Sequence, residues 1–192
     1  MRAGFLTFVL FCLMLSGHHV FAQQGIEKTP VEAREYIENA KFDATIYRGP
    51  VALKYPFSFK GTYYAYQKEF VKSSVEYNRK WYYGVDLNLD ASRDELCLSM
   101  PGSGIVIVLS KELVGRFVIG EDEFMNVKGD VPGLKDGYYQ VLESVDGTIY
   151  KKIVKKYNKL DGITLEFFPV EKYYCIKNGV ARRYKKIRRL GL

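Results

Sequence analysis

Tyr173-Tyr174-Cys175-Ile176-Lys177-Asn178-Gly179-Val180-Ala181-Arg182-Arg183-Tyr184 is the stretch of sequence that decides the fold class. Two short segments rich in aromatic and aliphatic residues flank Asn178-Gly179, the dipeptide that most strongly predicts a two-residue β-hairpin turn. A second signal of the same kind, Asp146-Gly147, stands between residues 138–145 and 148–157. The sequence therefore predicts antiparallel hairpins in the C-terminal part of the chain.

The same alternation of short aromatic or valine-rich segments with glycine, asparagine and aspartate turns extends back to residue 42. We predict a mainly β fold, an antiparallel curved sheet or a flattened barrel or sandwich, with one N-terminal helix. That helix would begin at Pro30, capped by Thr29, and run to about Ala40. The predicted strands are residues 57–66, 70–77, 81–89, 104–109, 114–119, 138–145, 148–157, 163–168, 173–177 and 180–187.

The first 22 residues have the pattern of a secretory signal peptide. Arg2 supplies the positive charge, residues 4–17 form an almost unbroken apolar run, and cleavage is predicted after Ala22. We expect export to the periplasm or cell envelope, with no transmembrane segment after cleavage. Residues 23–192 would then form a single β-rich domain with a basic C-terminal third, residues 151–192.

Cleavage would remove both histidines, His18 and His19. A mature chain without histidine excludes Ser-His and Cys-His nucleophile activation and histidine ligation of a metal ion. We therefore expect a binding protein rather than an enzyme, with no cofactor. Cys97 and Cys175 would remain, and both a disulfide bond and two buried free thiols are compatible with their apolar surroundings.

The charge of the chain is concentrated near its C-terminus. Residues 151–192 contain 13 Lys or Arg and 3 Asp or Glu. Such a segment attracts anionic surfaces, and we expect the partner to be an anionic envelope surface or another envelope protein, not nucleic acid. The candidate anion-binding residues are Lys151, Lys152, Lys155, Lys156, Arg182, Arg183, Lys185, Lys186, Arg188 and Arg189.

Carboxylates give two weaker signals. Residues 86–95 have the alternate polar spacing of a calcium loop, but Ala91 stands at the required glycine and Cys97 at the required glutamate, so a strand and a polar turn are predicted instead. The pairs Asp94-Glu95 and Asp122-Glu123 leave a carboxylate-based hydrolase open. A periplasmic carrier with a β cavity for a lipid or lipoprotein also stays open, whereas the charges of residues 151–156 argue against an outer-membrane barrel.

A scatter of aromatic, glycine and acidic residues extends from Tyr63 to Asn178-Gly179. It consists of Phe70, Val75-Glu76-Tyr77-Asn78, residues 82–87, Asp94-Glu95-Leu96, Phe117, Phe124, Gly137-Tyr138-Tyr139, Lys172-Tyr173-Tyr174 and Asn178-Gly179. Through these residues the chain resembles, over most of its mature length, a set of uncharacterised exported β-rich envelope proteins of Gram-negative bacteria. The resemblance implies location in the envelope, but it implies no activity and no catalytic residues.

Overall fold

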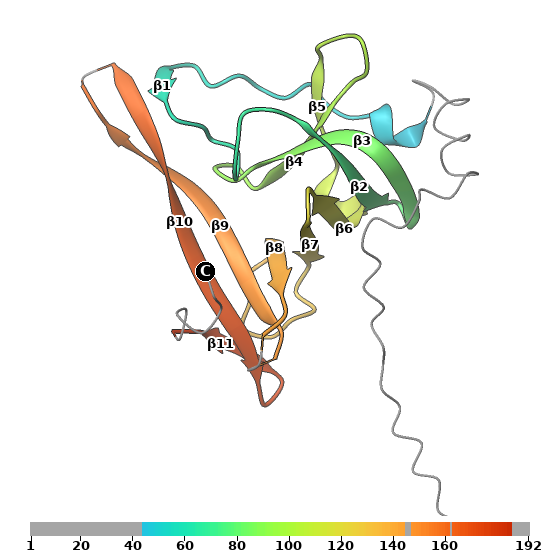
Figure 1. Ribbon diagram of the computed structural model, residues 1–192, viewed down its shortest axis with the longest axis vertical. Helices are drawn as coiled ribbons and strands as arrows, with labels where there is room; N and C mark the ends of the chain where they lie inside the picture. The colour runs from blue at the N-terminus through green and yellow to red at the C-terminus, as the bar shows by residue number, and fades with distance from the viewer. Residues whose placement is uncertain (1–43, 145–146, 162, 186–192) are drawn as a thin grey trace, which may run out of the picture.

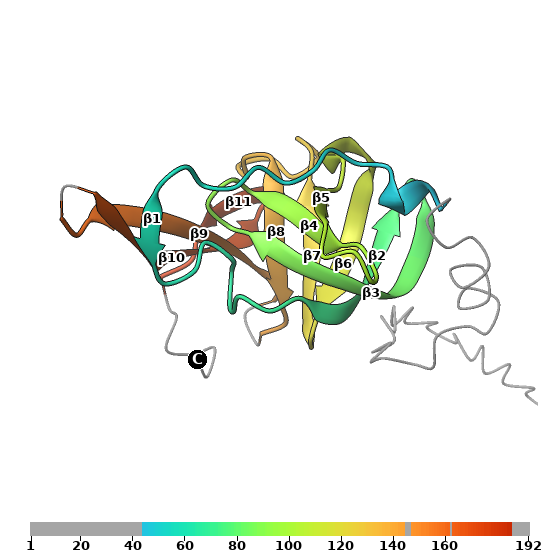
Figure 2. The same ribbon diagram turned by 90° about the horizontal axis from the view of Figure 1, so that it is seen from above.

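The computed structural model describes residues 44–144, 147–161 and 163–185. Within them, eleven strands form one large, curved, open sheet (Figures 1 and 2). Two short 3-10 turns, η2 (Thr45–Tyr47) and η3 (Lys111–Leu113), accompany it. The strands are β1 (Ser58–Lys60), β2 (Val71–Tyr77), β3 (Lys80–Asp90), β4 (Glu95–Ser99), β5 (Val106–Val108), β6 (Val114–Ile119), β7 (Asp122–Val127), β8 (Gly137–Leu142), β9 (Ile149–Lys159), β10 (Thr164–Lys177) and β11 (Val180–Arg183).

The strand order is β1-β10-β9-β8-β7-β6-β2-β3-β4-β5, with β11 also paired to β10. Every pair is antiparallel except β1 with β10, which is parallel. The predicted mainly β, curved sheet is confirmed, and within the described residues it stays open, with β1 and β5 at its edges. The predicted signal peptide and N-terminal helix lie outside the described residues. No described helix has the length and apolar character needed to span a membrane.

The predicted hairpin at Asn178-Gly179 is present, and another two-residue hairpin turn lies at Asn78-Arg79. Asn178 and Gly179 have φ angles of 53° and 75° between β10 and β11, and Asn78 and Arg79 have 50° and 63° between β2 and β3. Two consecutive positive φ angles are the mark of a type I′ turn, whose twist matches the flanking strands. The strand predicted at residues 114–119 coincides with β6.

Other strand predictions were wrong in identifiable ways. Of residues 57–66 only β1 is a strand, because Gly61 turns the chain with a φ of 78° and a β carbon there would lie 2.9 Å from the Phe167 carbonyl oxygen. The strands β4 and β7 were not predicted. Each is short; β4 begins and ends with a polar residue and β7 begins with two carboxylates, which makes both resemble turns in sequence.

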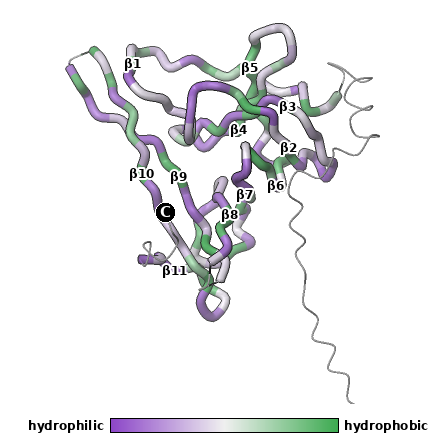
Figure 3. Tube along the Cα trace, in the orientation of Figure 1, coloured by the Kyte–Doolittle hydropathy of each residue, from purple (hydrophilic) through white to green (hydrophobic). Residues whose placement is uncertain are grey.

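The main core lies on the inner side of the curved sheet, and Figure 3 shows its hydrophobic segments converging around β4, β6 and β8. The Phe117 and Phe124 rings stack at 4.8 Å, and Tyr138 meets Phe117 edge to face at 5.2 Å. These three side chains are almost fully buried. They join β6, β7 and β8 into the rigid centre of the molecule.

The strands β9 and β10 form a long arm that extends from this centre, with β1 near one end and β11 near the other (Figures 1 and 2). The sequence predicted two strands, residues 163–168 and 173–177, but β10 continues through Pro169. The opposite residue, Lys155, donates its backbone N–H to Ala91 instead of to β10, at 3.0 Å. Pro169 therefore occupies a pair that needs no N–H from it, which is where a strand tolerates proline.

Candidate functional site

The ten candidate anion-binding residues do not form one surface. Lys151 and Lys152 point to opposite faces of β9, as neighbours on a strand must, and each is paired to a carboxylate. The Lys151 ammonium lies 2.8 Å from Glu171, and that of Lys152 lies 2.5 Å from Asp94. Their positive charges are therefore neutralised within the sheet.

Lys155 and Lys156 also point to opposite faces of β9, and they differ in exposure. Lys155 is 8% exposed on the inner face, where burial lowers the pKa of its ammonium, whereas Lys156 on the outer face is exposed. The register places Lys156 opposite Phe168, and Arg182 opposite Cys175, seven positions further along β10. At about 3.3 Å per residue the two cations are roughly 23 Å apart.

Arg182, Arg183 and Lys185 are exposed at the β11 end, and none forms an ion pair with a described residue. The Arg183 guanidinium lies over the Tyr174 ring at 5.7 Å. Lys186, Arg188 and Arg189 lie outside the described residues. We define the terminal hairpin surface as the exposed side chains on the two faces of this hairpin: Ile176 and Arg183 on one face, Lys177, Val180 and Arg182 on the other, and Lys185 just beyond β11.

Asp94 is the centre of an ionic cluster that the sequence did not predict. It lies in the turn between β3 and β4 with a φ of 59° and accepts hydrogen bonds from the ammonium groups of Lys111 and Lys152. A β carbon at Gly137 would collide with both the Asp94 carboxylate and the Lys152 ammonium. Burial outweighs the attraction of Asp94 and lowers the pKa of Lys152. This cluster fastens the β3–β4 turn to β9.

A second polar cluster lies on the inner face of β10. Glu171 accepts hydrogen bonds from Lys151 and from the Tyr173 hydroxyl, the latter at 2.5 Å. Burial alone would raise the pKa of Glu171, but these two hydrogen bonds outweigh it and lower the pKa. Burial and the bond to Glu171 raise the pKa of Tyr173. These contacts stabilise an ionised carboxylate, which is the arrangement of a structural ion pair.

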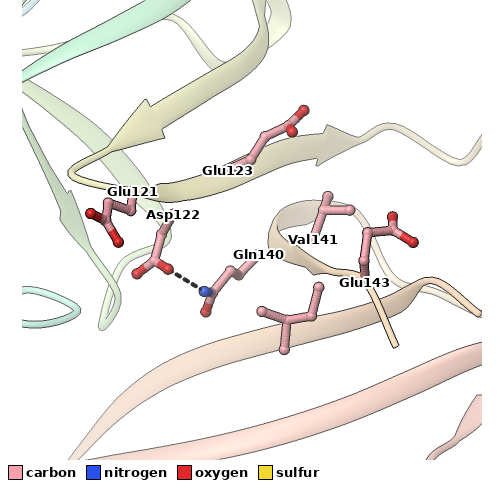
Figure 4. Close-up of a pocket in the computed structure, with 7 residues that line it drawn as sticks. Glu121, Asp122, Glu123, Gln140, Val141 and Glu143 are labelled. Atoms are coloured by element: carbon pink, nitrogen blue, oxygen red, sulfur yellow. Dashed lines mark hydrogen bonds between the residues drawn. The ribbon is translucent and has the colours of Figure 1, made fainter. Parts of the chain in front are cut away.

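A cleft of about 300 Å³ lies between the start of β7 and the end of β8 (Figure 4). The Gln140 amide donates to Asp122 at 2.7 Å and accepts from the Tyr66 hydroxyl at 3.1 Å. Such a cleft favours a cationic or hydrogen-bond-donating group, and its polarity gives no support to a lipid carrier. Its lining residues are Glu121, Asp122, Glu123, Gln140, Val141, Leu142 and Glu143.

Neither carboxylate pair noted in the sequence forms a hydrolytic pair. Asp122 and Glu123 are consecutive residues of β7, so their side chains point to opposite faces, and Glu123 is bound by Arg116 at 3.3 Å. Asp94 is held by two lysines, while Glu95 begins β4. A hydrolase needs two carboxyl groups facing one substrate bond, and these pairs do not provide them.

The two cysteines of the described chain, Cys97 and Cys175, are free and buried. Burial raises the pKa of the Cys97 thiol to about 12, so it is not a thiolate at neutral pH. Both therefore act as small apolar core residues, one of the two alternatives that the sequence left open.

No protein-family profile, curated protein or solved structure matches this chain. Sequence reasoning noted Asp94 only as a member of a carboxylate pair and missed its ionic partners, Lys111 and Lys152, which are 17 and 58 positions away along the chain. Lys177, an exposed member of the terminal hairpin surface, was also missed, although its place beside Asn178-Gly179 was a local signal for an exposed turn cation.

Proposed function

We propose that this chain is an exported, non-enzymatic binding protein of the cell envelope that docks on an anionic surface through its terminal hairpin surface. The observation that supports this proposal is the contrast among the basic residues. Lys151 and Lys152 are paired to carboxylates, whereas Arg182, Arg183 and Lys185 are exposed and form no ion pair with a described residue. Unpaired cations are the ones whose charge remains available to a partner.

The charge within the terminal hairpin segment itself has one sign. Residues 172–185 include five Lys or Arg and no Asp or Glu, and three further basic residues follow at positions 186, 188 and 189. Each cation near an anionic lipid surface contributes about 1 kcal/mol, and the attraction falls within a Debye length of roughly 10 Å at 0.1 M salt. Electrostatic docking of this kind needs no preformed pocket.

The test is sedimentation of the full chain with vesicles made of equal parts phosphatidylcholine and phosphatidylglycerol. We expect binding that weakens as salt is raised, and no comparable binding to phosphatidylcholine alone. Arg182→Gln/Lys185→Gln should weaken it by about 30-fold, the equivalent of two charges at about 1 kcal/mol each. Salt-independent binding, or none at all, would contradict the proposal.

A matched control is available away from the terminal hairpin, near the two ends of β2. Lys68 and Arg79 are exposed and form no ion pair with a described residue, so Lys68→Gln/Arg79→Gln removes the same net charge from another place. If this control weakens binding as much as Arg182→Gln/Lys185→Gln, net charge and not the terminal hairpin surface is responsible.

A further inference from the structure

We infer that the anionic surface is a lipid bilayer and that Ile176 and Val180, on either side of the Asn178-Gly179 turn, enter it. This inference rests on the proposed function and adds the identity of the partner. Ile176 is 40% exposed and Val180 is 41% exposed. The register pairs Ile176 with Ala181 and Val180 with Lys177, so the two side chains leave opposite faces of the hairpin next to its turn. Exposed aliphatic side chains gain nothing from water, and a hairpin tip that carries one on each face can enter an apolar phase end-on.

The charges around these two side chains complement a bilayer of anionic lipids. Lys177, Arg182, Arg183 and Lys185 carry positive charge within the same hairpin. The adjoining loop between β7 and β8 adds no net charge, because it contains Lys128 and Lys135 as well as Asp130 and Asp136. Aliphatic groups with cations beside them match the bilayer interface, where acyl chains lie beneath anionic headgroups. An acidic soluble partner would satisfy the cations but not the aliphatic groups.

The hairpin is held rigidly, so docking requires little further ordering. The Tyr184 N–H donates to the Tyr173 carbonyl, and the Ala181 N–H donates to the Pro132 carbonyl, both at 2.7 Å. A β carbon at Gly133 would lie 2.5 Å from the Ala181 carbonyl oxygen, so the loop packs directly on β11. Pairing of β10 with β9 ends at Cys175, and pairing with β11 continues to Lys177, directly before the Asn178-Gly179 turn. A preformed element loses less entropy on binding than a flexible one.

The other end of the arm provides a matched comparison. The turn between β9 and β10 exposes Leu160 by 46% and Ile163 by 80%, more than the terminal turn exposes its aliphatic residues. Its lysines are accompanied by carboxylates, because Asp161 lies in the turn and Glu166 opposite Lys60. Exposure alone would select this end for the bilayer, whereas exposure combined with charge selects the terminal hairpin.

The experiment compares three forms of the full chain: wild type, Ile176→Thr/Val180→Thr, and Leu160→Thr/Ile163→Thr. Threonine keeps the β-branched shape of isoleucine and valine, so the hairpin should stay folded, as circular dichroism can verify. Each form is titrated with the anionic vesicles and with soluble polyglutamate. We expect Ile176→Thr/Val180→Thr to bind the vesicles about tenfold more weakly than wild type. Its affinity for polyglutamate should be unchanged. Leu160→Thr/Ile163→Thr should bind both as wild type does.

The outcomes distinguish failure of the bilayer inference from failure of the proposed electrostatic docking. If Ile176→Thr/Val180→Thr binds vesicles as tightly as wild type while binding remains salt-sensitive, the bilayer inference fails and electrostatic docking stands. Equal weakening toward polyglutamate, or a loss of vesicle binding only in Leu160→Thr/Ile163→Thr, also overturns the inference. If wild type binds no anionic vesicles, both fail.

Discussion

The two ends of β10 differ in the side chains that they bring together and in the surface that they present. At the β1 end, the aromatic cluster of Tyr55, Phe57, Phe59, Tyr63, Tyr157 and Phe167 joins ring to ring, with centroid separations from 4.5 to 6.5 Å. At the β11 end, Figure 3 shows a hydrophilic strand, and its cations are exposed. The aromatic side chains at the β1 end pack against one another, whereas the cations at the β11 end form no ion pair with a described residue.

This difference shows that a segment rich in basic residues does not by itself form a continuous basic surface. Lys151 and Lys152, in the middle of the arm, meet carboxylates from β10 and from the β3–β4 turn, and their charge contributes to the fold. Lysines and arginines at the β11 end have no such neighbour among the described residues. The proposed docking depends on these unpaired cations and not on Lys151 and Lys152, and three changes test this division.

The largest expected effect is at the aromatic end. Phe167 is 6% exposed and its ring contacts those of Tyr55, Phe57 and Phe59. Phe167→Ala should lower the free energy of unfolding by about 3 to 5 kcal/mol, the cost of a buried ring and the cavity that it leaves. Chemical denaturation measures it. Phe168→Ala, on the opposite face of the same strand and only half-buried, should cost clearly less, and equal losses would contradict the aromatic cluster as a core.

The middle of the arm should show a smaller loss of stability and no loss of binding. Lys152→Met removes one of the two lysines that bind Asp94, and we expect about 1.5 to 3 kcal/mol of destabilisation, the range for a hydrogen bond to a charged group. Binding to anionic vesicles should equal that of wild type. Lys156→Met, four residues along on the same face but exposed, should change stability by less than about 0.5 kcal/mol. A vesicle-binding defect in Lys152→Met would mean that this lysine contributes to the docking surface.

The sequence predicted the features that short segments determine. Asn178-Gly179 specified its hairpin, and residues 114–119 specified β6, because turn chemistry and strand alternation are local. The continuation of β10 through Pro169 was not predictable, since the strand tolerates proline there because the opposite residue, Lys155, donates its backbone N–H to the Ala91 carbonyl. The pairing of Lys152 with Asp94 joins residues 58 positions apart. Local sequence patterns carry no signal for such a contact, so the division of the basic segment emerged only from the fold.

The smallest expected effect concerns Asp90, which links the main sheet to the aromatic end. Its carboxylate accepts hydrogen bonds from the Tyr55 hydroxyl at 3.0 and 3.1 Å and from the Ser92 and Arg93 N–H groups at 2.9 and 3.0 Å. The Arg93 guanidinium in turn lies over the Tyr55 ring at 4.0 Å. Burial raises the pKa of Asp90 despite these hydrogen bonds, so ionisation is less favourable in the folded chain than in the unfolded one.

A carboxyl group with a raised pKa in the folded state adds stability below its unfolded pKa, and this contribution disappears as the pH rises through the folded value. Asp90→Asn removes the titration while keeping an oxygen that can accept both backbone N–H groups. The unfolding free energy of Asp90→Asn relative to wild type should therefore increase between pH 4 and pH 7, as denaturation midpoints at the two pH values would show. A relative decrease over this interval would mean that the hydrogen bonds from Tyr55, Ser92 and Arg93 outweigh burial, and that Asp90 holds the aromatic end in place as a stabilised anion.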